Sequence, residues 1–356
     1  MAFAPWPDRL ARLPILRTRR ALEQAHAALE EQRTEIAGLR ENLRRAQGRS
    51  DIEKAKRRAL ERRTRLRRTR QQGRFHTPTH GEIFGGWNDA QYAFANVVSY
   101  PKSGRTWFST LYFHYTRFYF NEPVIRAKSL YTPERNRGFQ EMLSRRACGG
   151  VFPVCRFAHL GSSRLKPYER QPAPWPDRTD ATLTHPTVLI VRDPRDVVVS
   201  HYHHLRALDG SIEPDLMLEE FIRGAWGIRR VVRFMNMWAE HVRANDSRLA
   251  ICSFEELRRD AAAAFSAAMT FLGAPIDAGA LARAVEESTF ERLQEQERSQ
   301  RVDRKLSLDP DSFRFRQGTV GAHTHELSAS DRDYLDTIVA RHLDPAFLPY
   351  HRTAAT

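Results

Sequence analysis

The stretch from Val97 to Trp107 carries the residue types that bind a phosphate or a sulfate. Its sequence, VVSYPKSGRTW, is an apolar run that stops at Pro, Lys, Gly and hydroxyl residues before a helical pattern begins. This order predicts a strand, a tight loop and a helix N-terminus. Such a loop points backbone N–H groups at one spot, with the positive end of the helix dipole behind them. We therefore predict an anion site at this loop, to which Lys102 adds a mobile point charge.

The loop differs from the phosphate-binding loop of nucleoside triphosphatases. In that pattern one Gly opens the loop and a second Gly directly precedes the Lys, whereas here Lys102 stands two positions before Gly104 and no Gly opens the loop. The sequence also lacks a magnesium-binding pattern. We therefore keep a nucleotide kinase on a similar scaffold only as a disfavoured alternative.

A second stretch predicts another anion site at a strand end. Thr187 to Val191 is a continuous run of β-branched residues and leucine, which is typical of a strand buried on both faces. It ends in the sequence RDPRD at 192–196 and enters a helical pattern. Arg192 leaves the strand end and Ser200 lies one or two turns inside the helix, so both can reach one anion. On its own, RDPRD could instead be a helix cap with an ion pair. A nucleotide with two separate phosphate groups would satisfy both stretches.

Strand and helix patterns alternate through the globular part of the chain. We expect strands at 96–100, 152–157, 187–191 and 249–254, and helices at 106–118, 197–205, 216–244, 255–272 and 278–287. This alternation predicts an α/β fold with a doubly wound, mainly parallel sheet and a P-loop-like anion loop. Ligands of such sheets bind at the carboxyl ends of the strands, where both stretches lie.

The two stretches together resemble the sulfotransferase family that uses 3'-phosphoadenosine 5'-phosphosulfate (PAPS). YPKSGRTW is similar to the family's 5'-phosphosulfate loop, and VLIVRDPRDVVVSHY to its 3'-phosphate strand and helix. Three further matches follow in order: FEEL at 254–257 to the family's Tyr-Glu-Asp-Leu, STF at 288–290 to its adenine-side element, and FRQGTVG at 315–321 to its Arg-Lys-Gly loop. The resemblance covers about residues 95–325, and it assigns residues 75–356 to a sulfotransferase domain.

The resemblance implies a role for each matching residue. Lys102 would hold the bridging oxygen of the leaving phosphate. Sulfuryl transfer would then proceed by positioning and charge neutralisation, without a metal. The remaining implied contacts are the 5'-phosphate (Ser103, Gly104, Arg105, Thr106), the 3'-phosphate (Arg192, Ser200, Arg316), the adenine (Trp107, Phe254, Ser288, Phe290) and the loop that carries Arg316 (Gln317, Gly318).

The acceptor hydroxyl or amine needs a base, and His159 occupies the place of the family's catalytic histidine. A neutral imidazole takes a proton at pH 7. Some carbohydrate-directed relatives use a Glu instead, so Glu169 and His185 in the Pro-rich loop at 167–186 are the next candidates. The acceptor is expected to be a glycan, a glycolipid or a small metabolite, selected by the loops at 120–150, 160–186 and 206–215.

Several residues depart from the family pattern. Arg105 stands where the family has Thr or Ser, Phe254 replaces a Tyr, and Gln317 replaces a Lys. These changes leave open a second hypothesis, a catalytically degenerate protein that binds a nucleotide or an anionic polymer. His201, His203 and His204 fall where the family has aromatic residues, and we expect them to pack rather than to bind a metal.

The N-terminal 74 residues differ in composition from the rest. They hold 21 Lys/Arg and 9 Asp/Glu, a net charge of +12 out of +14 for the whole chain. Apolar residues recur every seventh position at Leu22, Leu29, Ile36 and Leu43, which predicts a coiled coil over 22–46 and a homo-oligomer. A single helix packed on the globular body is the alternative.

Residues 54–74 carry eleven Lys/Arg residues. Such a segment could bind an anionic membrane surface, a glycan or nucleic acid, or be a solvated helix. Nucleic acid is disfavoured, because no aromatic residues interleave for base stacking.

The location of the protein is predicted from the cysteines and the hydropathy. Cys148, Cys155 and Cys252 are an odd number without C-x-x-C spacing, which fits a reducing compartment. The start has no uninterrupted apolar region, and no stretch approaches the length of a membrane span. We expect a cytoplasmic protein. Residues 1–17 are expected to be a frayed or self-packed terminus, and an amphipathic piece that rests on a membrane surface is the alternative.

Overall fold

The computed structural model describes residues 91–122, 124–125, 136–159, 183–209, 216–304, 315 and 318–351. The predicted coiled coil at 22–46, the basic segment at 54–74 and most of the Pro-rich loop lie outside the described residues. The expectations about them stay predictions.

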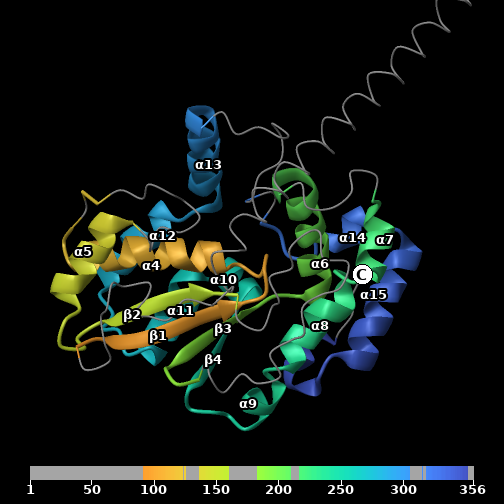
Figure 1. Ribbon diagram of the computed structural model, residues 1–356, viewed down its shortest axis with the longest axis horizontal. Helices are drawn as coiled ribbons and strands as arrows, with labels where there is room; N and C mark the ends of the chain where they lie inside the picture. Colours follow the sequence, from red (N-terminus) through yellow and green to blue (C-terminus); the bar gives the residue numbers. More distant parts are fainter. Residues whose placement is uncertain are drawn as a thin grey trace, which may run out of the picture. The chain divides into compact units, whose positions relative to one another are not determined.

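Four parallel strands form the sheet (Figure 1), in the order β2-β1-β3-β4. Their bounds are Ala93–Ser99 (β1), Pro153–Ala158 (β2), Thr187–Val191 (β3) and Leu249–Ser253 (β4). The chain adds β2 on one side of β1 and then returns to add β3 and β4 on the other side. The direction of growth therefore reverses between β1 and β3, and a ligand crevice is expected at their carboxyl ends.

Helices cover both faces of this sheet. Successive strand residues point to opposite faces, so Val97 belongs to one core and Val98 to the other. The first core includes residues of α4 (Arg105–Tyr119), α5 (Arg137–Arg146), α11 (Ala261–Phe271) and α12 (Ala278–Glu287). The second includes residues of α6 (Pro194–His203), α7 (Leu218–Arg223), α8 (Ile228–Asn236), α9 (Ala239–Arg243) and α15 (Ala329–His342). The predicted doubly wound, parallel α/β sheet is thus present in the described residues.

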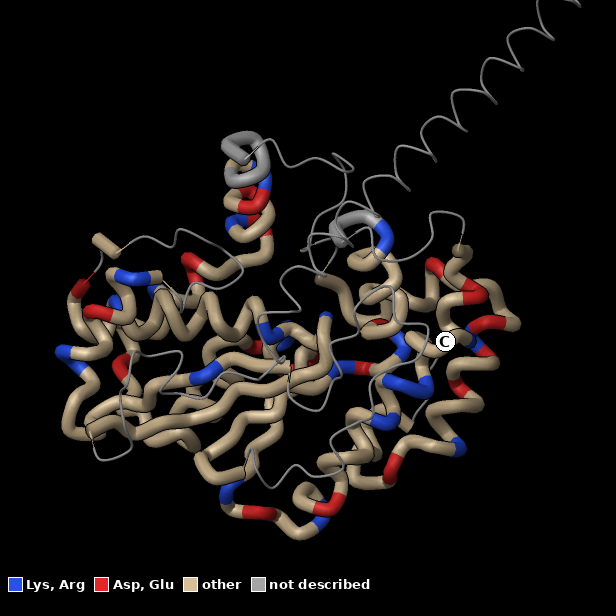
Figure 2. Tube along the Cα trace, in the orientation of Figure 1, with Lys and Arg blue, Asp and Glu red and all other residues tan. Residues whose placement is uncertain are grey.

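The strands carry almost no charge, and β1, β2 and β3 are buried along nearly their whole length (Figure 2). Arg156 in β2 is the one charged residue in the four strands of the described sheet. Its Nε donates to the side-chain oxygen of Asn96 in β1 at 3.0 Å, which gives the half-buried guanidinium a partner.

Two predicted helices are in fact broken. The helix predicted over 216–244 is three helices, α7, α8 and α9. A Cβ at Gly227 would lie 2.0 Å from the carbonyl oxygen of Ile222, so only glycine allows the chain to turn this closely. The helix predicted over 255–272 is α10 (Phe254–Arg259) and α11, separated by Asp260 in an extended conformation. The carboxylate of Asp260 accepts from the Ala263 N–H and starts α11.

The remaining helices follow the last strand or surround the site. They are a π-helical turn after α6 (η2, His204–Asp209), α13 (Phe290–Arg304), α14 (His323–Glu326) and a 3₁₀ segment (η3, Pro345–Tyr350). Among the described residues, no helix has the length and apolar character needed to cross a membrane.

Candidate active site

The loop between β1 and α4 has the backbone geometry of an anion-binding loop. Gly104 caps α4 with a φ of 105°, and Lys102 also has a positive φ of 73°. A Cβ at Gly104 would lie 2.9 Å from the ring of Phe254, so the position requires glycine for space as well as for conformation. The N–H of Ser103 donates to the carbonyl of Tyr100 at 3.3 Å and closes the turn. The strand, loop and helix predicted here are confirmed.

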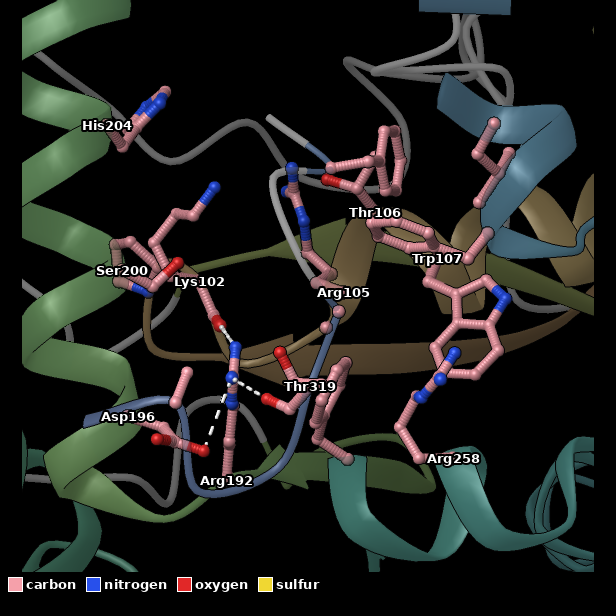
Figure 3. Close-up of a pocket in the computed structure, with 18 of the residues that line it drawn as sticks. Lys102, Arg105, Thr106, Trp107, Arg192, Asp196, Ser200, His204, Arg258 and Thr319 are labelled. Carbon is pink, nitrogen blue, oxygen red and sulfur yellow. Dashed lines mark hydrogen bonds and ion pairs between the residues drawn. The ribbon is translucent and has the colours of Figure 1, made fainter. Parts of the chain in front are cut away.

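Arg192 joins this loop to two other parts of the chain. Its Nη1 donates to the Lys102 carbonyl at 3.4 Å, and its Nη2 donates to the Thr319 carbonyl at 2.9 Å (Figure 3). The guanidinium also lies 4.2 Å from the centre of the Phe254 ring. Within the described residues, the buried Nε of Arg192 has no hydrogen-bond partner. This orphaned donor at the cavity wall fits an anionic ligand.

Asp196 holds the segment after Gly318 in place. Its buried carboxylate accepts from the Gly321 N–H at 2.8 Å and from the backbone N–H and Nδ1 of His323 at 3.1 and 2.8 Å. It also lies 3.4 Å from Nη2 of Arg192. Burial raises the pKa of Asp196, but the hydrogen bonds from His323 and the charge of Arg192 outweigh it and lower the pKa to about 2. Asp196 is therefore a carboxylate at neutral pH.

Aromatic rings form one wall next to these cations. Trp107 Nε1 donates to the Ser288 carbonyl at 2.8 Å, and its ring meets that of Phe254 edge-on at 5.9 Å. The guanidinium of Arg258 lies 5.8 Å from the centre of the Trp107 ring. A wall of this kind suits a planar aromatic base.

Phe290 packs closely on the segment that Asp196 holds. A Cβ at Gly318, whose φ is 62°, would lie 2.6 Å from the Phe290 ring. Phe290 also meets Phe315 edge-on at 6.5 Å. The family-like Phe290 and Gly318 therefore lie in mutual contact although they are distant in sequence.

His159 directly follows the last residue of β2, at the same edge of the sheet. Its Nδ1 lies 3.0 Å from the carbonyl oxygen of Ser99 and 3.2 Å from the Ser99 hydroxyl. A carbonyl oxygen only accepts, so we assign the proton of the neutral ring to Nδ1, which leaves the lone pair on Nε2. This tautomer is the one a general base at Nε2 requires.

One cavity, about 1070 Å³ of open space including the part that reaches solvent, unites most of the predicted site residues. These are Lys102, Gly104, Arg105, Thr106, Trp107, His159, Arg192, Ser200, Phe254, Phe290 and Gly318. Ser103 and Ser288 are not among the lining residues and are buried, at 3% and 1% exposure. Arg316 and Gln317 lie outside the described residues.

Comparison with known proteins identifies the family of the chain. The family model for the sulfotransferase domain matches residues 95–345. The chain belongs to the sulfotransferase-domain family. Human sulfotransferase 1C2 is 25% identical over 167 residues, which cover 44% of this chain and 53% of the human protein. The 3-beta-hydroxysteroid sulfotransferase of Cavia porcellus is 26% identical over 157 residues, which cover 42% of this chain and 53% of that protein.

The chain thus matches about half the length of these curated relatives. Among solved structures, the mouse sulfotransferase SULT7A1 complexed with PAP has a TM-score of 0.47 and 19% identity, covering 77% of this chain and 93% of that one.

The alternative bases differ in position from His159 in this sulfotransferase-domain chain. His185 lies just before β3 begins, and its ring meets that of Phe94, near the start of β1, at 6.1 Å. It is therefore at the amino edge of the parallel sheet, opposite the cavity. Glu169 lies outside the described residues.

The three neighbouring histidines have separate environments. His201 is buried against the rings of Tyr100 and Trp226, and burial, followed by the charges of Lys102 and Arg230, lowers its pKa to about 3. His203 Nε2 lies 2.6 Å from a carboxylate oxygen of Glu326. His204 is half-buried and lines the cavity. The described residues contain no group of three or more His, Cys, Asp or Glu placed to hold a metal ion.

Among the cavity residues that sequence reasoning did not assign to the site, four are polar or charged: Asp196, His204, Arg258 and Thr319. Two of them had a signal in the sequence, because Asp196 lies four residues after Arg192, and Arg258 lies one helical turn after Phe254 in α10. Thr319 contributes a backbone carbonyl, for which residue type carries no signal.

Proposed function

We propose that this chain transfers a sulfuryl group from PAPS to a hydroxyl or an amine of an acceptor. The proposal rests on the contacts of Arg192. Its guanidinium hydrogen-bonds to the carbonyls of Lys102, in the β1–α4 loop, and of Thr319, and it lies against the ring of Phe254 in the aromatic wall. Two anion-binding strand ends and a base-stacking wall thereby open into one cavity. A nucleotide with two separated phosphate groups matches this arrangement.

The residues divide between the two phosphates and the base. The β1–α4 loop, with Ser103, Thr106 and the N-terminus of α4, would bind the 5'-phosphate by backbone and hydroxyl donors. Arg192 and Ser200 would bind the 3'-phosphate, joined by Arg316 in the expectation from the family resemblance. The adenine would stack at the aromatic wall, whose members are Trp107, Phe254 and Phe290, with Ser288 behind it.

PAPS would supply an activated sulfuryl group. His159 Nε2 would accept the proton of the acceptor hydroxyl as the acceptor oxygen bonds to sulfur. Lys102 would stabilise the negative charge that builds on the phosphate oxygen as the sulfur–oxygen bond breaks. The hydrogen bond to the Ser99 carbonyl would keep the imidazole in the required tautomer and stabilise it once it is charged.

The proposal is tested by nucleotide binding and by sulfate transfer. The desulfated nucleotide 3'-phosphoadenosine 5'-phosphate (PAP) should raise the melting temperature of the wild type. This rise should vanish in Lys102→Ala and Arg192→Ala. Arg137→Ala is the control, because its side chain is 91% exposed and pairs only with nearby Glu141 among the residues described. PAPS-dependent transfer to a panel of glycans, glycolipids and small hydroxyl compounds then tests catalysis.

A wild type whose melting temperature PAP does not change would overturn the proposal. Binding of PAP without transfer to any acceptor would favour the second hypothesis, a catalytically degenerate nucleotide-binding protein. The altered family positions Arg105 and Phe254, both of which line the cavity, are the observation that supports it.

A further inference from the structure

The two ends of the cavity differ in chemistry. Aromatic rings line one end, where Trp107 and Phe254 meet and Phe290 packs on Gly318. Lys102, Arg105, His159 and His204 also line the cavity. Figure 3 shows Lys102 and His204 on the side opposite Trp107 and Arg258. Figure 3 shows the side chains of Lys102 and Arg105 extending to the same side of the β1–α4 loop, away from Arg192.

This basic part of the cavity faces little negative charge. Among the described residues that line the cavity, Asp196 is the one with an acidic side chain. Its carboxylate is engaged by Gly321, His323 and Arg192, on the side of the loop where the 3'-phosphate is proposed to bind. The acceptor side is therefore positively charged.

Arg105 lies on the side of the proposed base. It is the first residue of α4, and its Nη1 donates to the carbonyl oxygen of Phe157 at 3.4 Å. Phe157 is two residues before His159 in the chain. Arg192, which directly follows β3, contacts instead the carbonyl oxygens of Lys102 and Thr319. The guanidinium groups of Arg105 and Arg192 therefore contact different backbone segments around the cavity.

We propose that Arg105 selects an acceptor that carries an anionic group, a carboxylate, sulfate or phosphate, beside the reacting hydroxyl. The inference rests on the proposed function, because it takes His159 as the group that meets the acceptor. A guanidinium presents two parallel N–H donors that match the two oxygens of such a group. The acceptor would then be held by its anion at Arg105, with its hydroxyl at Nε2 of His159.

The alternative role for Arg105 is on the donor, where its charge would neutralise the 5'-phosphosulfate. The two roles differ in what the Arg105→Thr variant loses, since threonine is a residue that the family carries at this position. If Arg105 contacts the nucleotide, Arg105→Thr weakens nucleotide binding, and transfer to every acceptor falls alike. If Arg105 contacts the acceptor, Arg105→Thr leaves nucleotide binding intact and changes only the discrimination between charged and neutral acceptors.

The experiment uses matched acceptors that differ only in charge. One pair is 4-hydroxyphenylacetate and its neutral amide, and a second is methyl galacturonoside and its amide. For the wild type, Arg105→Thr and Arg105→Lys, we would measure the melting temperature with PAP, the additional shift caused by each acceptor, and kcat/KM for sulfate transfer.

In the wild type we expect at least one carboxylate to be preferred over its amide by about tenfold, the effect of one charge-assisted pair. Arg105→Thr should abolish this preference through KM, Arg105→Lys should keep part of it, and the PAP-induced shift should stay as in the wild type.

Equal treatment of acid and amide by the wild type, or no stabilisation of the PAP-bound protein by either carboxylate, would overturn the inference. So would loss of the PAP-induced shift in Arg105→Thr, which would place Arg105 on the donor. Failure of PAP to stabilise the wild type would instead overturn the proposed function itself.

Discussion

Replacing Asp196 by Asn tests whether a single buried carboxylate holds the site together. The substitution keeps the shape of the side chain but removes the charge that faces Arg192, and it places an NH₂ group or one oxygen before the donors of Gly321 and His323. We expect a lower free energy of unfolding and weaker nucleotide binding, because the Gly318 segment would no longer be fixed over Arg192.

The magnitude follows from the pKa of Asp196. A fall from the ordinary value of 3.8 to about 2 means that the charged carboxylate interacts more favourably in the folded protein by roughly 2.5 kcal/mol. Because the pKa is lowered on folding, this stability is present above pH 3.8 and is lost as the pH falls toward 2. At neutral pH Asp196→Asn should therefore lose about 2.5 kcal/mol.

Urea unfolding at several pH values measures this difference. Asp260→Asn is the matched control, since the exposed Asp260 caps α11 and Asn caps a helix equally well, so its stability should change by less than about 0.5 kcal/mol. The reasoning is refuted if Asp196→Asn has the same urea midpoint as the wild type at pH 7. It is also refuted if the difference in free energy of unfolding between the two proteins does not shrink as the pH falls toward 2.

Three further substitutions probe the loop, the base and a buried histidine. Gly104→Ala should destabilise the protein by about 1–3 kcal/mol and weaken PAP binding in calorimetry, because the positive φ and the Phe254 ring leave no space for a methyl group; wild-type affinity would contradict this. His159→Gln should lower kcat at least about a hundredfold with the PAP-induced melting shift unchanged, and an unchanged kcat would exclude His159 as the base. His201→Phe should flatten the pH dependence of urea unfolding: with a pKa near 3 the buried ring stays neutral, so stability falls as the pH drops below about 6.5, by roughly 2 kcal/mol at pH 5. A variant with the wild-type pH slope would show that His201 is not its source.

Much of the sheet, and the two strand ends that meet at the cavity, could be predicted from local pattern. The strand at Thr187–Val191 was predicted to the residue, because an uninterrupted run of β-branched residues and leucine is bounded by Pro186 and Arg192. Lys102 and Arg192 could be placed at one edge, since parallel strands end on the same side of a sheet. The helix α13 was not predicted, because it carries Leu293 among mostly charged residues and has no apolar stripe.

The tertiary structure alone decided which residues distant in sequence contact each other. The break at Gly227 comes from its approach to the Ile222 carbonyl, and no local propensity encodes such a contact. The separate positions of Arg105 and Arg192 likewise depend on which backbone carbonyl each guanidinium reaches, at Phe157 or at Lys102 and Thr319.

The sequence by itself determined the chemistry at each strand end, because residue type and the order of strand, loop and helix are local properties. The tertiary structure decided which strand ends are neighbours. It brought residues more than a hundred positions apart, Arg192 and Thr319, within a hydrogen bond of each other. Packing of two cores on one sheet sets these distances, and packing is a property of the whole folded domain.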